Sequence, residues 1–231
     1  MTSGVLFDLD GTLVDSRRDL AAAVNAMRRE RGLSALPLPE IVRHIGWGAR
    51  NLVARCLAPG GSPPSGPEPD LDPPSAEDVD GALAIFLERY DRCLLDTTLP
   101  YPGIRELLAE GMDRRVPMAV VTNKPERLSR KILAGLGLAD PFATVVGGDT
   151  MPEKKPSARP LLHALRALDR RPDQAVVVGD SETDLKAARA AGCAVILVSW
   201  GFTAEEELRG LTPDRRADTA LDLQKALWLE G

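Results

Sequence analysis

The sequence predicts a doubly wound α/β fold, in which a Rossmann-like parallel sheet core is interrupted by an inserted all-helical domain. Short apolar runs of strand length recur along the chain, and they are nearly continuous rather than alternating, which is typical of strands covered on both faces. Helical patterns separate most of these runs, as in parallel α/β sheets. One long early stretch carries helical patterns only, which indicates a separate helical insertion.

The predicted strands are the five apolar runs of the core. They are residues 5–10, 118–123, 143–149, 175–180 and 194–199. The intervening helices are residues 125–138, 157–169 and 181–192. Apolar residues at three- and four-residue spacing mark the first two, and a capping serine with a closing Gly192 marks the third.

The stretch from Ser16 to about Leu95 contains no convincing strand. Helical patterns occupy residues 17–32, 40–57 and 80–95. We therefore expect a catalytic core of residues 1–15 and 97–231, with a helical cap domain of residues 16–96. Residues 58–78 are crowded with proline, glycine and acidic residues, so we expect a mobile loop there.

Composition excludes several classes of function. The chain has 231 residues and a formal net charge of −5, and it offers no broad basic field for nucleic acid or for a membrane surface. Its three cysteines show no CxxC spacing, so neither a zinc site nor a disulfide framework is indicated. No signal peptide or membrane-spanning run is apparent. We expect a soluble cytoplasmic protein that is a monomer or a homodimer.

Polar residues gather where the predicted strands end. Ligands of open α/β sheets bind beyond the carboxyl ends of the strands. Asp8 and Asp10 follow the first strand, and two like charges beside a buried strand are costly unless a cation offsets them. The other polar residues near strand or helix ends are Thr122, Asn123, Lys124, Lys154, Lys155, Asp180 and Asp184. We expect several of these to converge on one edge of the sheet.

Four motifs occur in a characteristic order: DLDGTLVDS, VVTNK, KKPS and GDSETD. With them the chain resembles the haloacid dehalogenase superfamily, over nearly its whole length. Less specific segments, among them GWGARNLV, YPGIRELL and VVGGDTMPEKKP, resemble the phosphoglycolate phosphatases within that superfamily. The resemblance implies a Mg²⁺-dependent phosphomonoester hydrolase that acts on a small phosphate ester.

The resemblance also implies roles for individual residues. Asp8 would be the nucleophile that forms an aspartyl-phosphate, and Asp10 the general acid and base. Asp8, Asp180 and the backbone carbonyl of Asp10 would hold Mg²⁺. Thr122 and Asn123 would bind the phosphoryl oxygens, while Lys155 would neutralise them and hold Asp8.

Three further residues have supporting roles in this interpretation. The amide of Gly11 would join the phosphate cradle, and glycine there permits close approach of the backbone. Asp184 would support Lys155 or a metal-bound water. Arg50, in the GWGARN loop of the cap, is a candidate partner for a substrate carboxylate, with a solvated helix residue as the alternative.

The leading substrate is 2-phosphoglycolate, and other chemistries stay open. The first alternative is a phosphatase of the same architecture that acts on a sugar or amino-sugar phosphate, a nucleotide or pyrophosphate. A sugar phosphomutase is less favoured, because such enzymes usually carry serine where this chain has Thr122. A non-enzymatic phospho-ligand module is disfavoured because Asp8, Asp10, Lys155 and Asp180 are all present.

Overall fold

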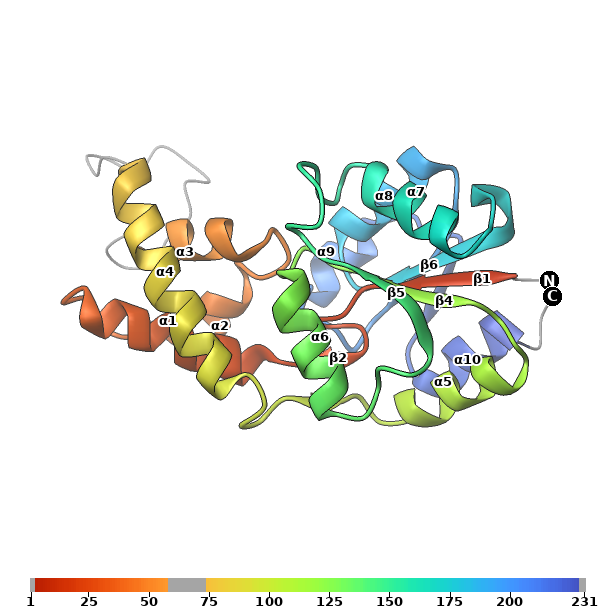
Figure 1. Cartoon of the computed structure of the whole chain (residues 1–231), viewed down its shortest axis with the longest axis horizontal. Helices are drawn as coiled ribbons and strands as arrows, with labels where there is room; N and C mark the ends of the chain where they lie inside the picture. Colours follow the sequence, from red (N-terminus) through yellow and green to blue (C-terminus); the bar gives the residue numbers. More distant parts are fainter. Residues whose placement is uncertain (1–2, 58–73, 229–231) are drawn as a thin grey trace. The chain divides into compact units, whose positions relative to one another are not determined.

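The structure is a computed structural model that describes residues 3–57 and 74–228. The chain divides into two compact units. One comprises Met1–Asp15 with Leu99–Gly231, and the other is Ser16–Thr98. Figure 1 shows the elements of each unit.

The first unit is built on a parallel sheet with the strand order β5-β4-β1-β6-β7-β8. Every pairing between neighbouring strands in it is parallel, which confirms the predicted sheet. The strands are β1 (Gly4–Phe7), β4 (Met118–Val121), β5 (Phe142–Val146), β6 (Ala175–Gly179), β7 (Ala194–Val198) and β8 (Arg215–Ala217). β8 was not among the predicted strands.

Helices lie on both faces of this sheet, as a doubly wound fold requires (Figure 1). α7 (Arg159–Ala167) and α8 (Glu182–Ala191) lie on one face, and α5 (Ile104–Asp113) and α10 (Ala220–Trp228) on the other. Leucines and alanines of α7 and α8 pack with valines of the sheet in one hydrophobic core. α6 (Glu126–Gly135) connects β4 to β5, η1 (Pro172–Gln174) precedes β6, and α9 (Glu205–Arg209) follows β7.

The regular secondary structure in the described part of the second unit is all helical. Its helices are α1 (Arg17–Glu30), α2 (Leu38–Val42), α3 (Ala49–Leu57) and α4 (Ala76–Cys93). α1 packs along α4 through buried side chains that include Val24, Met27, Phe86 and Tyr90. The rings of Phe86 and Tyr90 stack with their centroids 5.7 Å apart.

Two expectations for this unit need correction. The single helical pattern of residues 40–57 is two helices, because Gly46 and Gly48 adopt positive φ angles of 108° and 89° that break the helix. The loop predicted for residues 58–78 was wrong at its end. α4 begins at Ala76 because the Ser75 side chain accepts a hydrogen bond from the Asp78 N–H and caps the helix. Residues 58–73 of that predicted loop lie outside the described residues.

The chain leaves and re-enters the sheet unit through two paired segments. β2 (Val14–Asp15) pairs antiparallel with β3 (Leu99–Pro100), both in the sheet unit. Inside the helical unit, the buried Asp19 carboxylate accepts hydrogen bonds from the backbone and hydroxyl groups of Thr97 and Thr98. These bonds lie within the helical unit, which runs to Thr98, whereas its predicted end was residue 96.

Among the described helices, none combines the length and the hydropathy that a membrane crossing needs.

Candidate active site

Two acidic residues follow the central strand β1 directly. β1 is fully buried, and Leu9 continues the core while Asp8 and Asp10 flank it. The backbone N–H of Leu9 donates to Asp8 Oδ1 at 2.7 Å. Gly11 follows with a φ of +84°, a conformation that favours glycine, and it turns the chain at the strand end.

The neighbouring strand β6 delivers two more carboxylates. Asp180 follows β6 directly, and Asp184 lies in the first turn of α8. Ser181 caps that helix, and its hydroxyl donates to Asp184 Oδ2 at 2.5 Å. The strand end and the helix start therefore fix both carboxylates on the side where β1 places Asp8.

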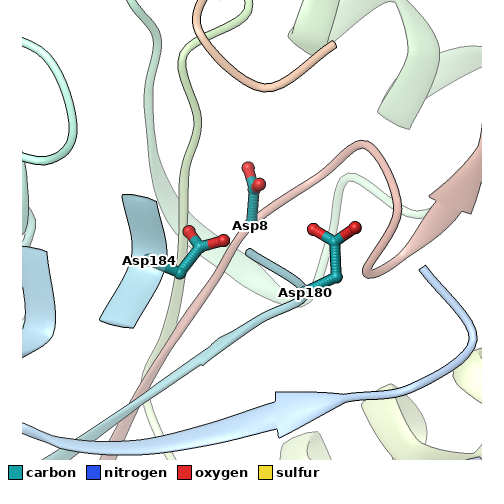
Figure 2. Close-up of side chains that lie close together, drawn as sticks. All are labelled: Asp8, Asp180 and Asp184. Atoms are coloured by element: carbon teal, nitrogen blue, oxygen red, sulfur yellow. The ribbon is translucent and has the colours of Figure 1, made fainter. Parts of the chain in front are cut away.

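Asp8, Asp180 and Asp184 converge, as Figure 2 shows. Each offers a carboxylate oxygen, and these oxygens lie within 4.8 Å of one another. Three buried carboxylates at this separation repel one another unless a cation lies among them. All the donors are hard oxygen atoms, which suit a cation such as Mg²⁺ or Ca²⁺. The cluster therefore fits a divalent metal ion.

Asp180 is confined by glycines of two loops. A Cβ atom placed on Gly11 or on Gly201 would collide with the Asp180 carboxylate. On the same side, the backbone N–H of Phe202 donates to Asp180 Oδ2 at 2.7 Å. The indole of Trp200 donates to the carbonyl oxygen of Thr12 at 3.1 Å, which ties the second loop to the first. The Asp180 carboxylate thus occupies space that the two glycines leave open, and the Phe202 N–H binds it there.

Lys155 supplies a positive charge to this cluster. Its buried Nζ lies 3.0 Å from Asp8 Oδ1 and 2.6 Å from Asp184 Oδ1. The side chain of Asn123 donates to the Lys155 carbonyl oxygen at 2.9 Å and so positions the lysine segment. Lys154 is less buried than Lys155. One ammonium group thus faces three carboxylates, and a divalent cation would balance the remaining charge.

The remaining predicted phosphoryl ligand lies at the end of β4. Thr122 is buried, and its hydroxyl accepts a hydrogen bond from the backbone N–H of Lys124 at 3.3 Å. Its neighbour Asn123 is also buried. β4 is the other partner of β1 in the sheet, so these residues end on the same edge as Asp8.

Lys124 is a site residue to which no role could be assigned from the motifs. Its Nζ lies 2.9 Å from both carboxylate oxygens of Asp10. Asp10 therefore does not join the cluster of Asp8, Asp180 and Asp184, because its side chain binds a lysine of its own. The only signal in the sequence was the position of Lys124 directly after the strand-end pair Thr122-Asn123.

Burial changes the acidity of the clustered groups. Burial, with the nearby charge of Asp184, raises the pKa of Asp8 to about 6, although Lys155 opposes the shift. The pKa of Asp180 is raised well above its ordinary value by burial and by the charges of Asp184 and Asp8. Burial alone would lower the pKa of Lys155, but Asp184 and Asp8 outweigh it and raise that pKa. Protons and a metal ion would therefore compete for the same carboxylates.

Arg50 lies in the helical unit, in the first turn of α3 rather than in a loop. Its guanidinium pairs with the carboxylate of Asp80 in α4, and about half of its side chain is exposed. This ion pair joins two helices of the same unit. Its proposed contact with a substrate carboxylate stays a prediction.

Comparison with known proteins identifies the family. A family model described as haloacid dehalogenase-like hydrolase matches residues 5–198. The chain belongs to the haloacid dehalogenase-like hydrolase family. This membership confirms the predicted resemblance and the prediction of an enzyme.

Individual relatives of this hydrolase are phosphoglycolate phosphatases. That of Chromobacterium violaceum is 45% identical over 203 residues, which cover 86% of this chain and 85% of the relative. That of Rhodospirillum rubrum is 42% identical over 205 residues, which cover 89% and 83% of the two chains.

Solved structures show the same fold. A protein described as a predicted phosphoglycolate phosphatase from Haemophilus somnus superposes on this hydrolase with a TM-score of 0.85, at 28% identity and 97% coverage of both chains. CbbY from Rhodobacter sphaeroides, solved in complex with phosphate, gives a TM-score of 0.74 at 27% identity and 96% coverage of both.

Proposed function

We propose that this hydrolase is a Mg²⁺-dependent phosphatase that converts 2-phosphoglycolate to glycolate and phosphate through an aspartyl-phosphate on Asp8. The observation that carries the proposal is the convergence of Asp8, Asp180 and Asp184 around one oxygen-lined position, with Lys155 beside Asp8. The names of the most similar relatives support the choice of substrate.

The metal site would be formed by Asp8, Asp180 and the backbone carbonyl of Asp10. Bound Mg²⁺ would offset the negative charge that a phosphate dianion brings to these carboxylates. Asp184 pairs with Lys155 and so helps to hold the ammonium beside Asp8.

Asp8 would attack phosphorus and release the alcohol. A phosphate ester is a polyanion that water attacks very slowly, and a covalent intermediate divides the displacement into two easier steps. Lys155 fixes Asp8 and faces the charge on the transferring phosphoryl group, to which Thr122 and Asn123 would also donate. The Gly11 N–H predicted for the same role donates instead to the Val14 carbonyl oxygen at 3.0 Å, because it closes the turn after β1. Asp10 would protonate the leaving oxygen and then remove a proton from the hydrolytic water.

The helical unit would act as the cap domain of the enzyme and help to select the substrate. Arg50 is the residue of this unit that we propose for substrate binding. A phosphatase of the same family acting on a sugar or amino-sugar phosphate, a nucleotide or pyrophosphate is the alternative, with a sugar phosphomutase after it. A cytoplasmic location, and a monomer or homodimer in solution, stay predictions.

The test is phosphate release from 2-phosphoglycolate, with Mg²⁺ and with a chelator, for the unmodified protein and for Asp8→Asn. We expect release that requires Mg²⁺ and falls at least about 10³-fold in the variant, because the nucleophile is gone. Asp140→Asn, on the exposed surface, is the isosteric control and should retain full activity.

Two outcomes would contradict the proposal in different ways. Activity that persists in Asp8→Asn would rule out the aspartyl-phosphate mechanism. Slow release from 2-phosphoglycolate with brisk release from another ester would leave the mechanism in place and change the substrate.

A further inference from the structure

Lys124 and Lys155 place two ammonium groups beside different carboxylates of the proposed site. Lys155 binds Asp8 and Asp184 within the metal cluster. Lys124 binds Asp10, with its Nζ 2.9 Å from each carboxylate oxygen and 4% of its side chain exposed. In the proposed mechanism Asp8 contacts phosphorus and Asp10 contacts the leaving oxygen. Lys124 therefore lies beside the leaving group.

The leaving group of 2-phosphoglycolate is very short. A single methylene carbon joins its ester oxygen to its carboxylate. When Asp10 binds the ester oxygen, the carboxylate must lie close to Asp10 as well. The ammonium of Lys124 is one hydrogen bond away from Asp10, so it lies within reach of that carboxylate.

Burial strengthens the attraction between the Lys124 ammonium and a substrate carboxylate. An ammonium group that is screened little by water attracts a carboxylate more strongly than one on the surface does. Hydrogen bonds between ionised partners are also among the strongest in proteins. An ester whose leaving group has no negative charge would gain nothing from Lys124.

We propose that Lys124 forms a carboxylate subsite that selects short phosphate esters with a carboxylate next to the ester carbon. Asp10 and Lys124 both belong to the sheet unit, so the subsite is built within one unit, where β1 and β4 end. The proposal rests on the proposed function, and it assigns substrate selection to the core in addition to the helical unit.

The test compares two ligands in a protein that cannot turn them over. In the Asp8→Asn background with Mg²⁺, calorimetry measures the Kd of 2-phosphoglycolate and of ethyl phosphate, which lacks only the carboxylate function. Adding Lys124→Met should weaken 2-phosphoglycolate binding about 10- to 100-fold, in line with the loss of one charge-assisted contact, and ethyl phosphate binding less than about twofold.

Matched variants show whether the effect belongs to this lysine. Lys131→Met removes the same charge from an exposed position on α6 and should change neither Kd. Lys124→Arg keeps a cation and should retain part of the preference. If Lys124→Met fails to fold, Lys124→Gln, which keeps a donor for Asp10, takes its place.

Three results would overturn the proposal that Lys124 forms a carboxylate subsite. Equal weakening of both ligands would show that Lys124 only holds Asp10. Unchanged binding of both would show that it contacts neither the substrate nor its surroundings. A loss specific to 2-phosphoglycolate in Arg50→Met, and absent in Lys124→Met, would move carboxylate recognition to the helical unit.

Turnover by the unmodified protein separates this proposal from the proposed function. If the unmodified protein hydrolyses 2-phosphoglycolate no better than ethyl phosphate, the proposed substrate is wrong. If it prefers 2-phosphoglycolate and Lys124→Met keeps the same ratio of kcat/KM values, the substrate stands and only the subsite is overturned.

Discussion

Asp180 owes its position to residues that have no side chain. Gly11 and Gly201 approach its carboxylate from two loops, and a methyl group on either would occupy the same space. Gly201 carries no positive φ, so its role is steric rather than conformational. The two glycines leave room for the carboxylate of this proposed metal ligand, and the N–H of Phe202 donates a hydrogen bond to it.

Substitution of Gly201 by alanine should displace the Asp180 carboxylate and weaken metal binding. We expect the Kd for Mn²⁺, measured by electron paramagnetic resonance without substrate, to rise about tenfold or more, as for the loss of a supporting contact to a metal ligand. Gly210→Ala is the matched control, because a Cβ there meets only the Glu207 carbonyl oxygen at 3.4 Å. Equal Mn²⁺ affinity in both variants would refute the steric role.

Single residues differ in how well the sequence predicts them. Asp8, Asp180, Asp184 and Lys155 could be placed together because strand ends share one edge and their motifs are specific. Lys124 received no role because its partner, Asp10, is 114 residues away, and no local pattern pairs them. A lysine after a strand is usually solvated, and only the fold shows that this one is buried.

Helices and strands also differ in how well the sequence predicts them. Continuous apolar runs predicted the strands of the sheet interior, whose residues are buried on both faces. β8 was not predicted because it has only three residues, of which Arg215 and Arg216 are exposed, so no apolar run marks it. The sequence did not reveal the break between α2 and α3, because the apolar spacing continues across it. α2 ends at Val42, and the positive φ angles of Gly46 and Gly48 prevent the helix from continuing into α3.

The start of α1 depends on one carboxylate. Asp19 is buried and accepts two backbone and two hydroxyl hydrogen bonds from Thr97 and Thr98, so it joins the segment that enters the helical unit to the segment that leaves it. Without it, the buried N–H and O–H groups of Thr98 and those of the more exposed Thr97 would lose their acceptor, which is costly for the buried pair.

Asp19→Ala should lower the free energy of unfolding by roughly 2–4 kcal/mol, because several donors lose their acceptor at once. Urea unfolding followed by circular dichroism measures the change. Asp96→Ala, on the exposed surface of the same segment, should have an effect within about 0.5 kcal/mol. Similar stabilities for the two variants would show that the Asp19 hydrogen bonds contribute little.

For the whole molecule, the acidic cluster links stability to pH and to metal. The pKa of Asp8 is raised to about 6 in the folded protein, above its ordinary value of 3.8. Below pH 4 its stabilising contribution is therefore fully present, and it is lost as pH rises through 6, because ionisation then occurs in a buried site. Metal binding would reverse this loss, since a cation stabilises the ionised form.

The increase in Tm that Mg²⁺ causes should therefore be larger at pH 7.5 than at pH 5. We expect a difference of about 2–8 °C from thermal unfolding at saturating Mg²⁺ and with a chelator, if the linkage is worth roughly 1–2 kcal/mol. Comparing the two states at each pH cancels the titration of groups elsewhere. Asp180→Asn should abolish the increase at both pH values. An increase independent of pH would contradict the linkage.

The strand order has a consequence for synthesis on the ribosome. β1 is the first strand to be translated, yet its two neighbours are β4 and β6, and β6 ends at Gly179. The nascent chain therefore carries this interior strand with no neighbour until β4 has emerged, and with only one neighbour until β6 follows. The helical unit, complete at Thr98, can fold during this interval, because domains generally fold as units in the order of their synthesis. The insertion thus delays the closing of the sheet, and the apolar strand β1 depends on protection from aggregation until β6 arrives.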